Sequence, residues 1–274
     1  MACLDWLLAN GADPELTGAW PPARAIIVAA FMGRPECVQR LRKAGAKVDG
    51  FAAAALGERK LVEKVLRERP DFVQERDRGG LTALQCAAGS EIAPAGTVEI
   101  ARLLIEAGAD VSVRTKSWNN EVDAVYFAVR SFNNGIFELL LDHGADPHGA
   151  LTSSVWAKRY DFAESALAHG AKPDLAVADG QPLLNNLVRW GQMQQMFWLL
   201  ARGASANLPD NRNWWTAVHQ AASRGSVRMT RALLDAGGDL KRRDKDGRTP
   251  RDVAIRMSRE KMLALLAPAT GATA

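Results

Sequence analysis

Two adjacent apolar residues, a short polar step and a Gly-Ala-Asp turn form a pattern that recurs along this chain. It occurs at residues 7–13, 103–110 and 140–146. Weaker copies centre on Gly45, Gly170, Gly203 and Gly237. A pattern that returns at intervals predicts an array of small repeats that stack in sequence order. It therefore directs the search for function to an extended surface instead of a single closed pocket.

The spacing of the turns defines the repeats. Turn glycines at positions 11, 45, 108, 144, 170, 203 and 237 are separated by 34, 63, 36, 26, 33 and 34 residues. The interval of 63 contains a degenerate copy at residues 65–71, in which Arg69 takes the place of the glycine. These turns end repeats one to eight, and a ninth repeat follows. The basic period is about 33 residues.

A second motif marks where each repeat begins. Residues 82–88 read Thr-Ala-Leu-Gln-Cys-Ala-Ala, residues 216–222 read Thr-Ala-Val-His-Gln-Ala-Ala, and residues 246–254 carry Asp-Gly-Arg-Thr-Pro. These motifs and the period resemble the ankyrin-repeat family, whose units begin with Thr-Pro-Leu-His and an alanine pair. The resemblance implies an all-α ankyrin-repeat solenoid of about eight to nine helix-turn-helix units. It covers residues 1–267 as a single array, with a half unit at the N-terminus and a flexible tail at 268–274.

Local physical chemistry supports the same helices. Thr82, Thr216 and Thr249 are each placed to cap a helix, because a threonine hydroxyl can accept a backbone N–H of the first turn. Gln85 completes a capping box with Thr82. Pro250 occupies the first helical position, where its missing N–H costs nothing. Each turn glycine suits the left-handed conformation that commonly ends a helix.

Several repeats depart from the common length. Residues 89–96 lengthen the link between the two helices of repeat four, and repeats three and six lack most of their hairpin. We expect short hairpins to open the groove wall locally and to bend the stack. Variable loops on a rigid scaffold are where binding specificity usually lies.

Composition narrows the functional classes. The 274 residues carry a net charge of +4 and 47% hydrophobic residues, which is ample for a folded chain. Cys3, Cys37 and Cys86 show no metal or redox spacing, and Cys86 is expected to be buried; a reducing, cytoplasmic location fits best. Neither a secretion signal nor a membrane span is apparent. Basic residues gather at 241–261, but interleaved acids make nucleic acid an unlikely partner. An anion-binding face there is the alternative to a solvated cap.

Tryptophan is the clearest departure from the repeat pattern, because ankyrin consensus units contain none. Five of the eight tryptophans map to hairpin tips and first helices, which form the concave groove of an ankyrin array: Trp118, Trp156, Trp190, Trp214 and Trp215. Aromatic residues exposed in a groove favour binding. The alternative is that some of them fill gaps in irregular repeats. Trp6 and Trp198 lie beside apolar pairs on second helices and are predicted to belong to the core.

Polar residues also replace small ones on the first helices of repeats five to seven. Together with the tryptophans they predict a polar, aromatic-walled trough over repeats five to eight, although ordinary solvated surface is equally compatible with them. The candidate contact residues are Trp118, Asn119, Asn120, Glu121, Asp123, Tyr126, Arg130, Trp156, Arg159, Asn185, Arg189, Trp190, Arg212, Trp214 and Trp215. Asp123 also fits an N-cap position, which would make it structural.

Catalytic chemistry finds little support. His219 follows Thr216 by three residues and matches the structural histidine of the family. No zinc-protease, Cys-x-x-Cys, phosphate-loop or Gly-x-Ser-x-Gly motif occurs, so no metal and no cofactor are expected. The leading hypothesis is a binding module that recognises a protein partner through its concave face. The alternative is a small-molecule or enzymatic pocket in the trough of repeats five to eight.

Overall fold

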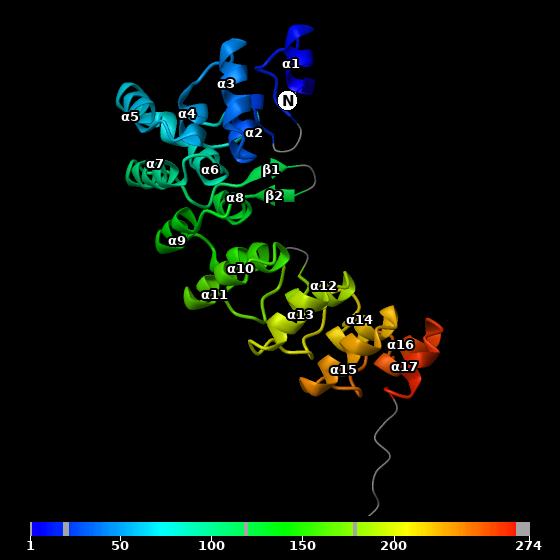
Figure 1. The fold of residues 1–274 in the computed structure, drawn as a ribbon. Coiled ribbons are helices and arrows are strands. Elements are labelled where there is room, and N and C mark those ends of the chain that lie inside the picture. Colours follow the sequence, from blue (N-terminus) through cyan, green and yellow to red (C-terminus); the bar gives the residue numbers. More distant parts are fainter. Residues whose placement is uncertain (1, 19–21, 118–119, 178–179, 267–274) are drawn as a thin grey trace, which may run out of the picture. The chain divides into compact units, whose positions relative to one another are not determined.

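A computed structural model of the chain describes residues 2–18, 22–117, 120–177 and 180–266. The predicted tail at 268–274 lies outside these residues. The chain divides into two compact units, Met1–His169 and Gly170–Ala274 (Figure 1). The described residues form seventeen α-helices, and these confirm the all-α solenoid. That the whole of residues 1–267 forms one array stays a prediction.

The N-terminal unit contains the half repeat and repeats two to six. The half repeat is α1 (Ala2–Ala9). The first helices of the following repeats are α2 (Ala25–Phe31), α4 (Gly50–Leu56), α6 (Ala83–Ala88), α8 (Ala124–Arg130) and α10 (Pro147–Trp156). Their second helices are α3 (Pro35–Lys43), α5 (Arg59–Glu68), α7 (Pro94–Glu106), α9 (Asn134–Asp142) and α11 (Tyr160–Ala168). Each first helix packs on its own second helix, and within this unit successive first helices, from α2 to α10, pack on one another.

The C-terminal unit contains repeats seven to nine. Its helix pairs are α12 (Leu183–Arg189) with α13 (Met193–Leu200), α14 (Ala217–Arg224) with α15 (Val227–Asp235), and α16 (Pro250–Arg256) with α17 (Glu260–Leu263). The first helices α12, α14 and α16 stack in chain order, as the first helices of the N-terminal unit do (Figure 1). Among the described residues, no helix has both the length and the apolar character that crossing a bilayer demands.

The predicted caps and turns are confirmed at most repeats. Thr82 accepts the Gln85 N–H at 3.2 Å, and the Gln85 side chain accepts the Thr82 N–H at 3.0 Å, which completes the capping box. The seven turn glycines have φ between +83° and +95°. Arg69 is the exception, with φ −140°, and its repeat ends in a 3-10 helix at Pro70–Gln74. A bulky side chain disfavours the left-handed conformation, so this repeat ends differently.

The core follows the apolar spine of each repeat. The alanine pairs of α6 and α14 are completely buried, and small side chains there let the helices approach closely. Cys86 is buried as predicted, and burial raises the pKa of its thiol well above the ordinary value. The prediction that Trp6 belongs to the core was wrong, because Trp6 is 64% exposed on α1. Trp198 is half-buried, with the Arg202 guanidinium 4.0 Å from its ring centroid.

Repeats three and six lack hairpins, as the sequence predicts. Helix α4 begins at Gly50, soon after the turn at Gly45, and α10 begins soon after Gly144. The neighbours of repeat three close over it instead of leaving an open wall, since Gly79, before α6, lies so close to the Pro22 carbonyl, before α2, that a Cβ at Gly79 would have no room. At the hairpin end, the buried Arg24 donates to Asp49 at 2.6 Å.

Candidate binding surfaces

The hairpin of repeat five carries the first group of candidate residues. Strands β1 (Thr115–Ser117) and β2 (Asn120–Val122) pair antiparallel, with Ser117 opposite Asn120. The strand pair is the one sheet in the described residues. Trp118 and Asn119 lie outside the described residues, and Asn120 is described only as a strand residue. Glu121 is exposed, so it is available for contact.

Asp123 supports helix α8. Its carboxylate accepts the Tyr126 N–H at 2.9 Å, which is the geometry of an N-cap. Burial raises the pKa of Asp123, and the Tyr126 hydrogen bond opposes that shift. Asp123 is therefore a structural residue of repeat five, the alternative that its sequence position had left open.

Tyr126 and Arg130 lie one turn apart on α8 and line a pocket of about 120 Å³. Phe31 and Phe127 are both buried beside it, with ring centroids 5.5 Å apart. The remaining lining residues are Met32, Gly89, Glu91 and Ser131. The pocket thus combines aromatic side chains with a phenol, a guanidinium and a carboxylate.

The pocket depends on a contact between distant repeats. Phe31 ends α2 in repeat two, and Phe127 belongs to α8 in repeat five. Gly89 makes room for this contact, because a Cβ at that position would lie 2.7 Å from the Phe31 ring. Sequence reasoning missed Phe31, Met32 and Glu91, since the repeat pattern gives no sign that residues from repeats two and four meet those of repeat five.

Trp156 and Arg159 mark the end of repeat six's first helix. Trp156 is half-buried at the last position of α10. The Arg159 guanidinium carbon lies 3.1 Å from the ring centroid of Phe132, which is 58% exposed and has φ +59°. Arg159 is thus engaged with an aromatic side chain of the preceding repeat. Phe132 is a further exposed aromatic residue that the sequence analysis did not select.

The prediction that Asn185, in the C-terminal unit, contacts a partner was wrong. It is completely buried, and its amide nitrogen donates to the Leu208 and Trp215 carbonyls at 3.0 and 2.8 Å. Asn185 therefore holds the hairpin of the next repeat and cannot contact a partner. Arg189 and Trp190, at the end of the same helix, are exposed, and Trp190 is 62% accessible.

Asn185 occupies the position that Gln85 and His219 occupy in their own repeats, since each of the three lies three residues after the N-cap residue of its helix. Gln85 donates to the Val113 carbonyl at 2.9 Å. His219 accepts the Thr216 N–H on Nδ1 at 3.2 Å and lies 3.2 Å from the Arg248 carbonyl on Nε2, so Nε2 carries the proton. Burial lowers the pKa of His219, which favours this neutral form. The structural role predicted for His219 is confirmed.

The hairpin tip of repeat eight is held from several directions. Asp210 accepts the backbone N–H groups of Arg212, Asn213 and Trp215 at 3.1, 2.7 and 3.3 Å. The Trp215 indole N–H donates to Asp244 at 3.0 Å. Its ring is stacked at 6.4 Å from that of His219 in the first helix. Half-buried Trp215 is thus largely a support of the tip.

Trp214 is presented differently from its neighbour. It is 54% exposed and has φ +59°, a left-handed conformation that bulky residues rarely adopt. The Lys245 ammonium lies 5.9 Å from its ring centroid. Arg212 is exposed on the same tip. The tip therefore offers one large aromatic surface together with positive charge.

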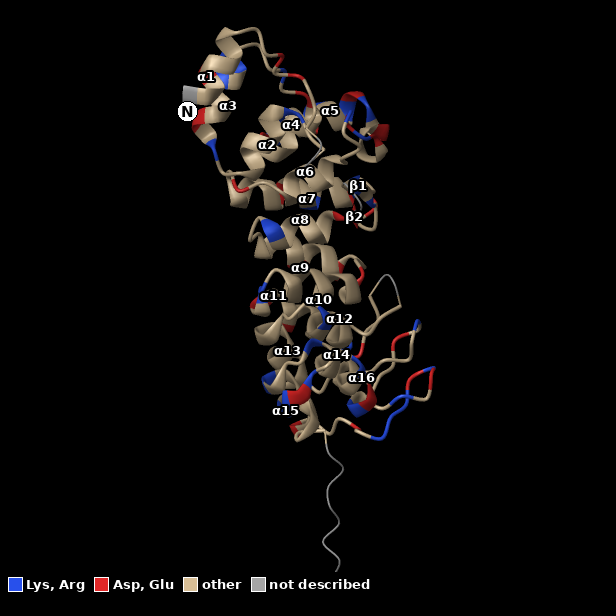
Figure 2. Cartoon of the chain, turned by 90° about the vertical axis from the view of Figure 1, so that its right-hand side faces the viewer, with Lys and Arg blue, Asp and Glu red and all other residues tan. Residues whose placement is uncertain are grey.

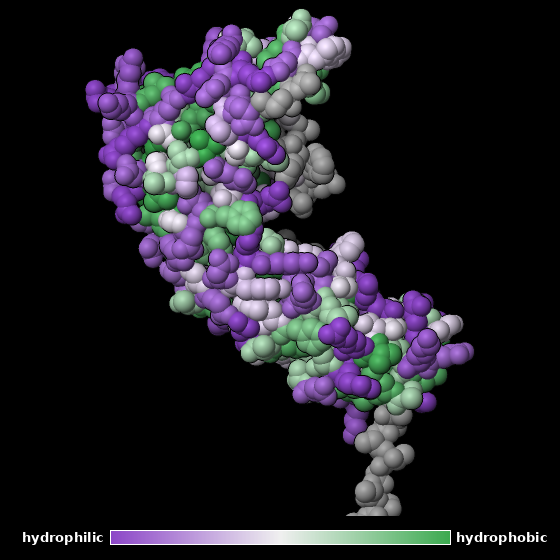
Figure 3. Space-filling view, viewed as in Figure 1, coloured by the Kyte–Doolittle hydropathy of each residue, from purple (hydrophilic) through white to green (hydrophobic). Residues whose placement is uncertain are grey.

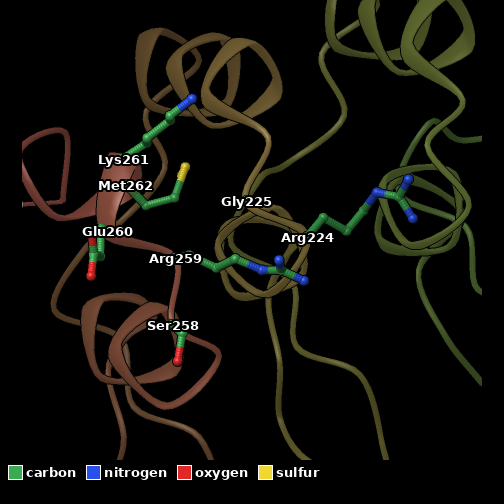
Figure 4. Close-up of a pocket in the computed structure, with 7 residues that line it drawn as sticks. All are labelled: Arg224, Gly225, Ser258, Arg259, Glu260, Lys261 and Met262. Atoms are coloured by element: carbon green, nitrogen blue, oxygen red, sulfur yellow. The ribbon is translucent and has the colours of Figure 1, made fainter.

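The open pocket of about 310 Å³ at the end of the C-terminal unit is lined by Arg224, Arg259, Glu260 and Lys261, among others. Figure 4 shows that these side chains diverge, with Arg224 directed away from Lys261. Arg224 donates to the Arg189 carbonyl at 2.6 Å and Arg259 to the Ser223 carbonyl at 3.0 Å. Both guanidinium groups thus connect successive repeats and do not converge on a common anion.

The predicted trough draws on both compact units. The helices of repeats five and six belong to the N-terminal unit, and those of repeats seven and eight belong to the C-terminal unit. The two units divide at Gly170, the turn that ends repeat six. Convergence of all the candidate residues on one trough therefore stays a prediction. No group of His, Cys, Asp and Glu that could hold a metal ion occurs within the described part of the chain.

Comparison with known proteins identifies the family. The family model described as "Ankyrin repeats (3 copies)" matches residues 50–150, and the one described as "Ankyrin repeats (many copies)" matches residues 199–254. The chain is similar to human transient receptor potential cation channel subfamily A member 1, with 23% identity over 209 residues, 69% of this chain and 18% of the channel. It is also similar to the ankyrin repeat and KH domain-containing protein mask-1 of Caenorhabditis elegans, with 25% identity over 239 residues, 81% of this chain and 9% of mask-1.

The chain thus spans less than a fifth of the length of either relative. Among solved structures, the human ASB11 ankyrin repeat domain shares the fold, with a TM-score of 0.56 and 22% identity over 90% of this chain and 99% of that one. Ankyrin repeats are generally protein–protein interaction modules. The matched repeats, the confirmed caps and turns and the shared fold lead to one conclusion: the chain belongs to the ankyrin-repeat family.

Proposed function

We propose that this chain is a binding module that recognises a protein partner through the concave face of its repeats. The hairpin tip of repeat eight is its principal contact in the C-terminal unit. The observation that carries the proposal is the exposed, left-handed Trp214 on a tip that is otherwise rigidly held.

The fold itself does not require tryptophan at this position. The equivalent hairpin positions carry Gly80, Gly180 and Gly247, with φ of +88°, +74° and +77°. A bulky residue in a sparsely populated backbone region costs about 1–3 kcal/mol, and such strain is concentrated at functional sites. Tryptophan is also among the residues most enriched at the energetic centres of protein interfaces. Partner binding explains why Trp214 takes a place that glycine would fill without strain.

The rest of the contact surface follows from exposure. In the C-terminal unit, Arg189, Trp190 and Arg212 join Trp214. In the N-terminal unit, Glu121 and Arg130 are exposed, and the half-buried Tyr126 and Trp156 add aromatic surface. Asn185 is excluded from the contact surface because it is buried. Asp123 and Trp215 hold the surface in place, Asp123 by accepting the Tyr126 N–H and Trp215 by donating to Asp244.

Affinity capture with the immobilised chain tests the proposal. Proteins retained from lysate of the source organism are identified and quantified for the wild type and for Trp214→Gly. Trp6→Ala serves as the matched control, since Trp6 is also an exposed tryptophan and lies on α1, which carries none of the proposed contact residues. We expect at least a tenfold loss of the specific partner for Trp214→Gly and none for Trp6→Ala. Equal capture by all three proteins would refute the assignment of the tip.

A second candidate function is supported by the pocket between Phe31, Tyr126 and Arg130 in the N-terminal unit. Its volume of about 120 Å³ approaches that of an apolar cavity of roughly 150 Å³ that binds benzene. This alternative predicts that small aromatic probes such as indole show saturation-transfer NMR signals with the wild type and not with Tyr126→Ala. Absence of any such signal with the wild type would rule out this second function.

A further inference from the structure

The hairpins of repeats eight and nine form one braced surface. The Lys245 N–H donates to the Asn213 carbonyl at 3.0 Å, and its ammonium donates to the Asn211 carbonyl at 3.2 Å. At the base, the Asn207 side chain donates to the Gly237 carbonyl and accepts the Asp239 N–H, both at 2.8 Å. These contacts order the two hairpins before any partner arrives, which reduces the entropy lost on binding.

The acidic groups of this surface are largely consumed by its own hydrogen bonds. Asp210 is buried beneath three backbone N–H groups. Asp244 is also buried, and it accepts the Arg248 N–H at 2.9 Å, the Arg248 guanidinium at 2.8 Å and the Trp215 indole N–H at 3.0 Å. Asp246 pairs with Arg248. The remaining exposed carboxylate, Asp239, accepts the Lys241 N–H.

The basic groups, in contrast, face solvent. The exposed cations of the two hairpins are Arg212, Lys241, Arg242, Arg243 and Lys245. Figure 2 shows Lys and Arg positions gathered along the hairpin that precedes α16. Within the described residues, the side chains of Lys241 and Arg242 make no ion pair. In Figure 3 most of the viewed face is hydrophilic, with hydrophobic residues in separate patches.

We infer that the partner segment that docks on these two hairpins is an acidic peptide with an apolar side chain that covers Trp214. This inference rests on the proposed function and names the chemistry of its partner. Carboxylates match the planar donors of Arg242, which can bind them in bidentate fashion. The apolar side chain contacts the exposed indole, and Lys245 lies close enough to the ring to meet an adjacent carboxylate.

Selection of random 12-residue peptides displayed on phage against the full chain, at 150 mM salt, tests the inference without a known partner. We expect enriched peptides to contain several Asp or Glu residues around an aromatic or aliphatic one. Fluorescence polarisation then measures affinities for the best peptide. Lys241→Gln combined with Arg242→Gln should weaken binding about fivefold, as two exposed ion pairs of modest strength imply. Higher salt should weaken wild-type binding and affect this variant less.

The control is Lys60→Gln combined with Arg67→Gln, which removes the same charge from exposed positions on α5. It should bind the selected peptide like the wild type. Enrichment of neutral or basic peptides, or of none, would overturn the inference. So would tighter binding of a 20-nucleotide single-stranded DNA than of the peptide under the same conditions.

The two proposals fail in different ways. If Trp214→Gly loses the peptide while the Lys241→Gln, Arg242→Gln variant binds normally, the acidic partner is wrong and the contact at the tip stands. If Trp214→Gly also retains both the peptide and the captured protein, the proposed function fails together with the inference. Circular dichroism spectra of all variants establish that each is folded.

Discussion

Substitution of Trp214 by glycine and, separately, by alanine distinguishes backbone strain from side-chain contact. Trp214 is 54% exposed, so a little under half of its surface, on the order of 110 Å², is covered. At about 25 cal/mol per Å², removing the side chain costs up to about 3 kcal/mol of unfolding free energy in either variant. Only glycine relieves the left-handed backbone, which disfavours other residues by about 1–2 kcal/mol.

The glycine variant also gains freedom in the unfolded chain, which costs it about 0.5–1 kcal/mol. We therefore expect Trp214→Gly to unfold with a free energy about 0.5–1 kcal/mol higher than that of Trp214→Ala, and both to be less stable than the wild type. Urea titrations followed by circular dichroism measure this difference. Both variants should nevertheless lose the partner equally, because binding depends on the indole ring.

Two results would refute this reasoning. If Trp214→Ala were as stable as Trp214→Gly, the tip would not hold residue 214 in a strained conformation, and the argument that function maintains the tryptophan would lose its basis. If partner binding followed stability, so that the glycine variant bound better than the alanine variant, the loss of binding would reflect loosening of the tip and not loss of the indole contact.

Three further predictions test the fold. Lys158→Gly should raise the free energy of unfolding, measured in urea, by about 0.5–1 kcal/mol, because exposed Lys158 has φ +58°. Ala157→Gly is the control, since Ala157 has φ −77°, and it should lower that free energy by a similar amount. Equal effects of the two substitutions would contradict the turn geometry. His219→Gln should flatten the dependence of stability on pH. Burial lowers the pKa of folded His219, so its stabilisation is present above the unfolded pKa of about 6.5 and is lost as pH falls towards the folded value; urea midpoints at pH 7.5 and 5.5 that shift equally in both proteins would argue against this. Arg24→Met should lower the free energy of unfolding by about 1–3 kcal/mol, since the Arg24 side chain is only 5% exposed and pairs with Asp49, which stays partly solvated. An unchanged urea midpoint would show that this ion pair is dispensable.

Much of the fold could be predicted because it depends on interactions within a few residues. The capping box joins Thr82 to Gln85, and each turn glycine accommodates a conformation of its own backbone. The period of about 33 residues then follows from the length of one helix pair and its hairpin. Arg69 takes the glycine place in the degenerate copy and follows the last residue of α5, but it has φ −140° because its side chain disfavours the left-handed conformation of the turn glycines.

The candidate site was predictable only in part. Trp214 was identified as an aromatic residue at a hairpin tip, where glycine is usual. Asn185 looked equally promising in sequence, yet its amide is buried against carbonyls 23 and 30 residues away. The pocket at Phe31 and Phe127 brings together residues of repeats two and five, which no periodic pattern relates.

The amino-acid sequence alone determined the repeats, their caps and their turns, because the hydrogen bonds and backbone preferences behind them act within three or four residues. Tertiary structure alone decided which polar and aromatic side chains reach solvent. That outcome depends on carbonyl groups and small residues supplied by neighbouring repeats, such as the Trp215 carbonyl for Asn185 and Gly89 for Phe31. Side chains of the same chemical type are therefore structural in one repeat and available to a partner in another.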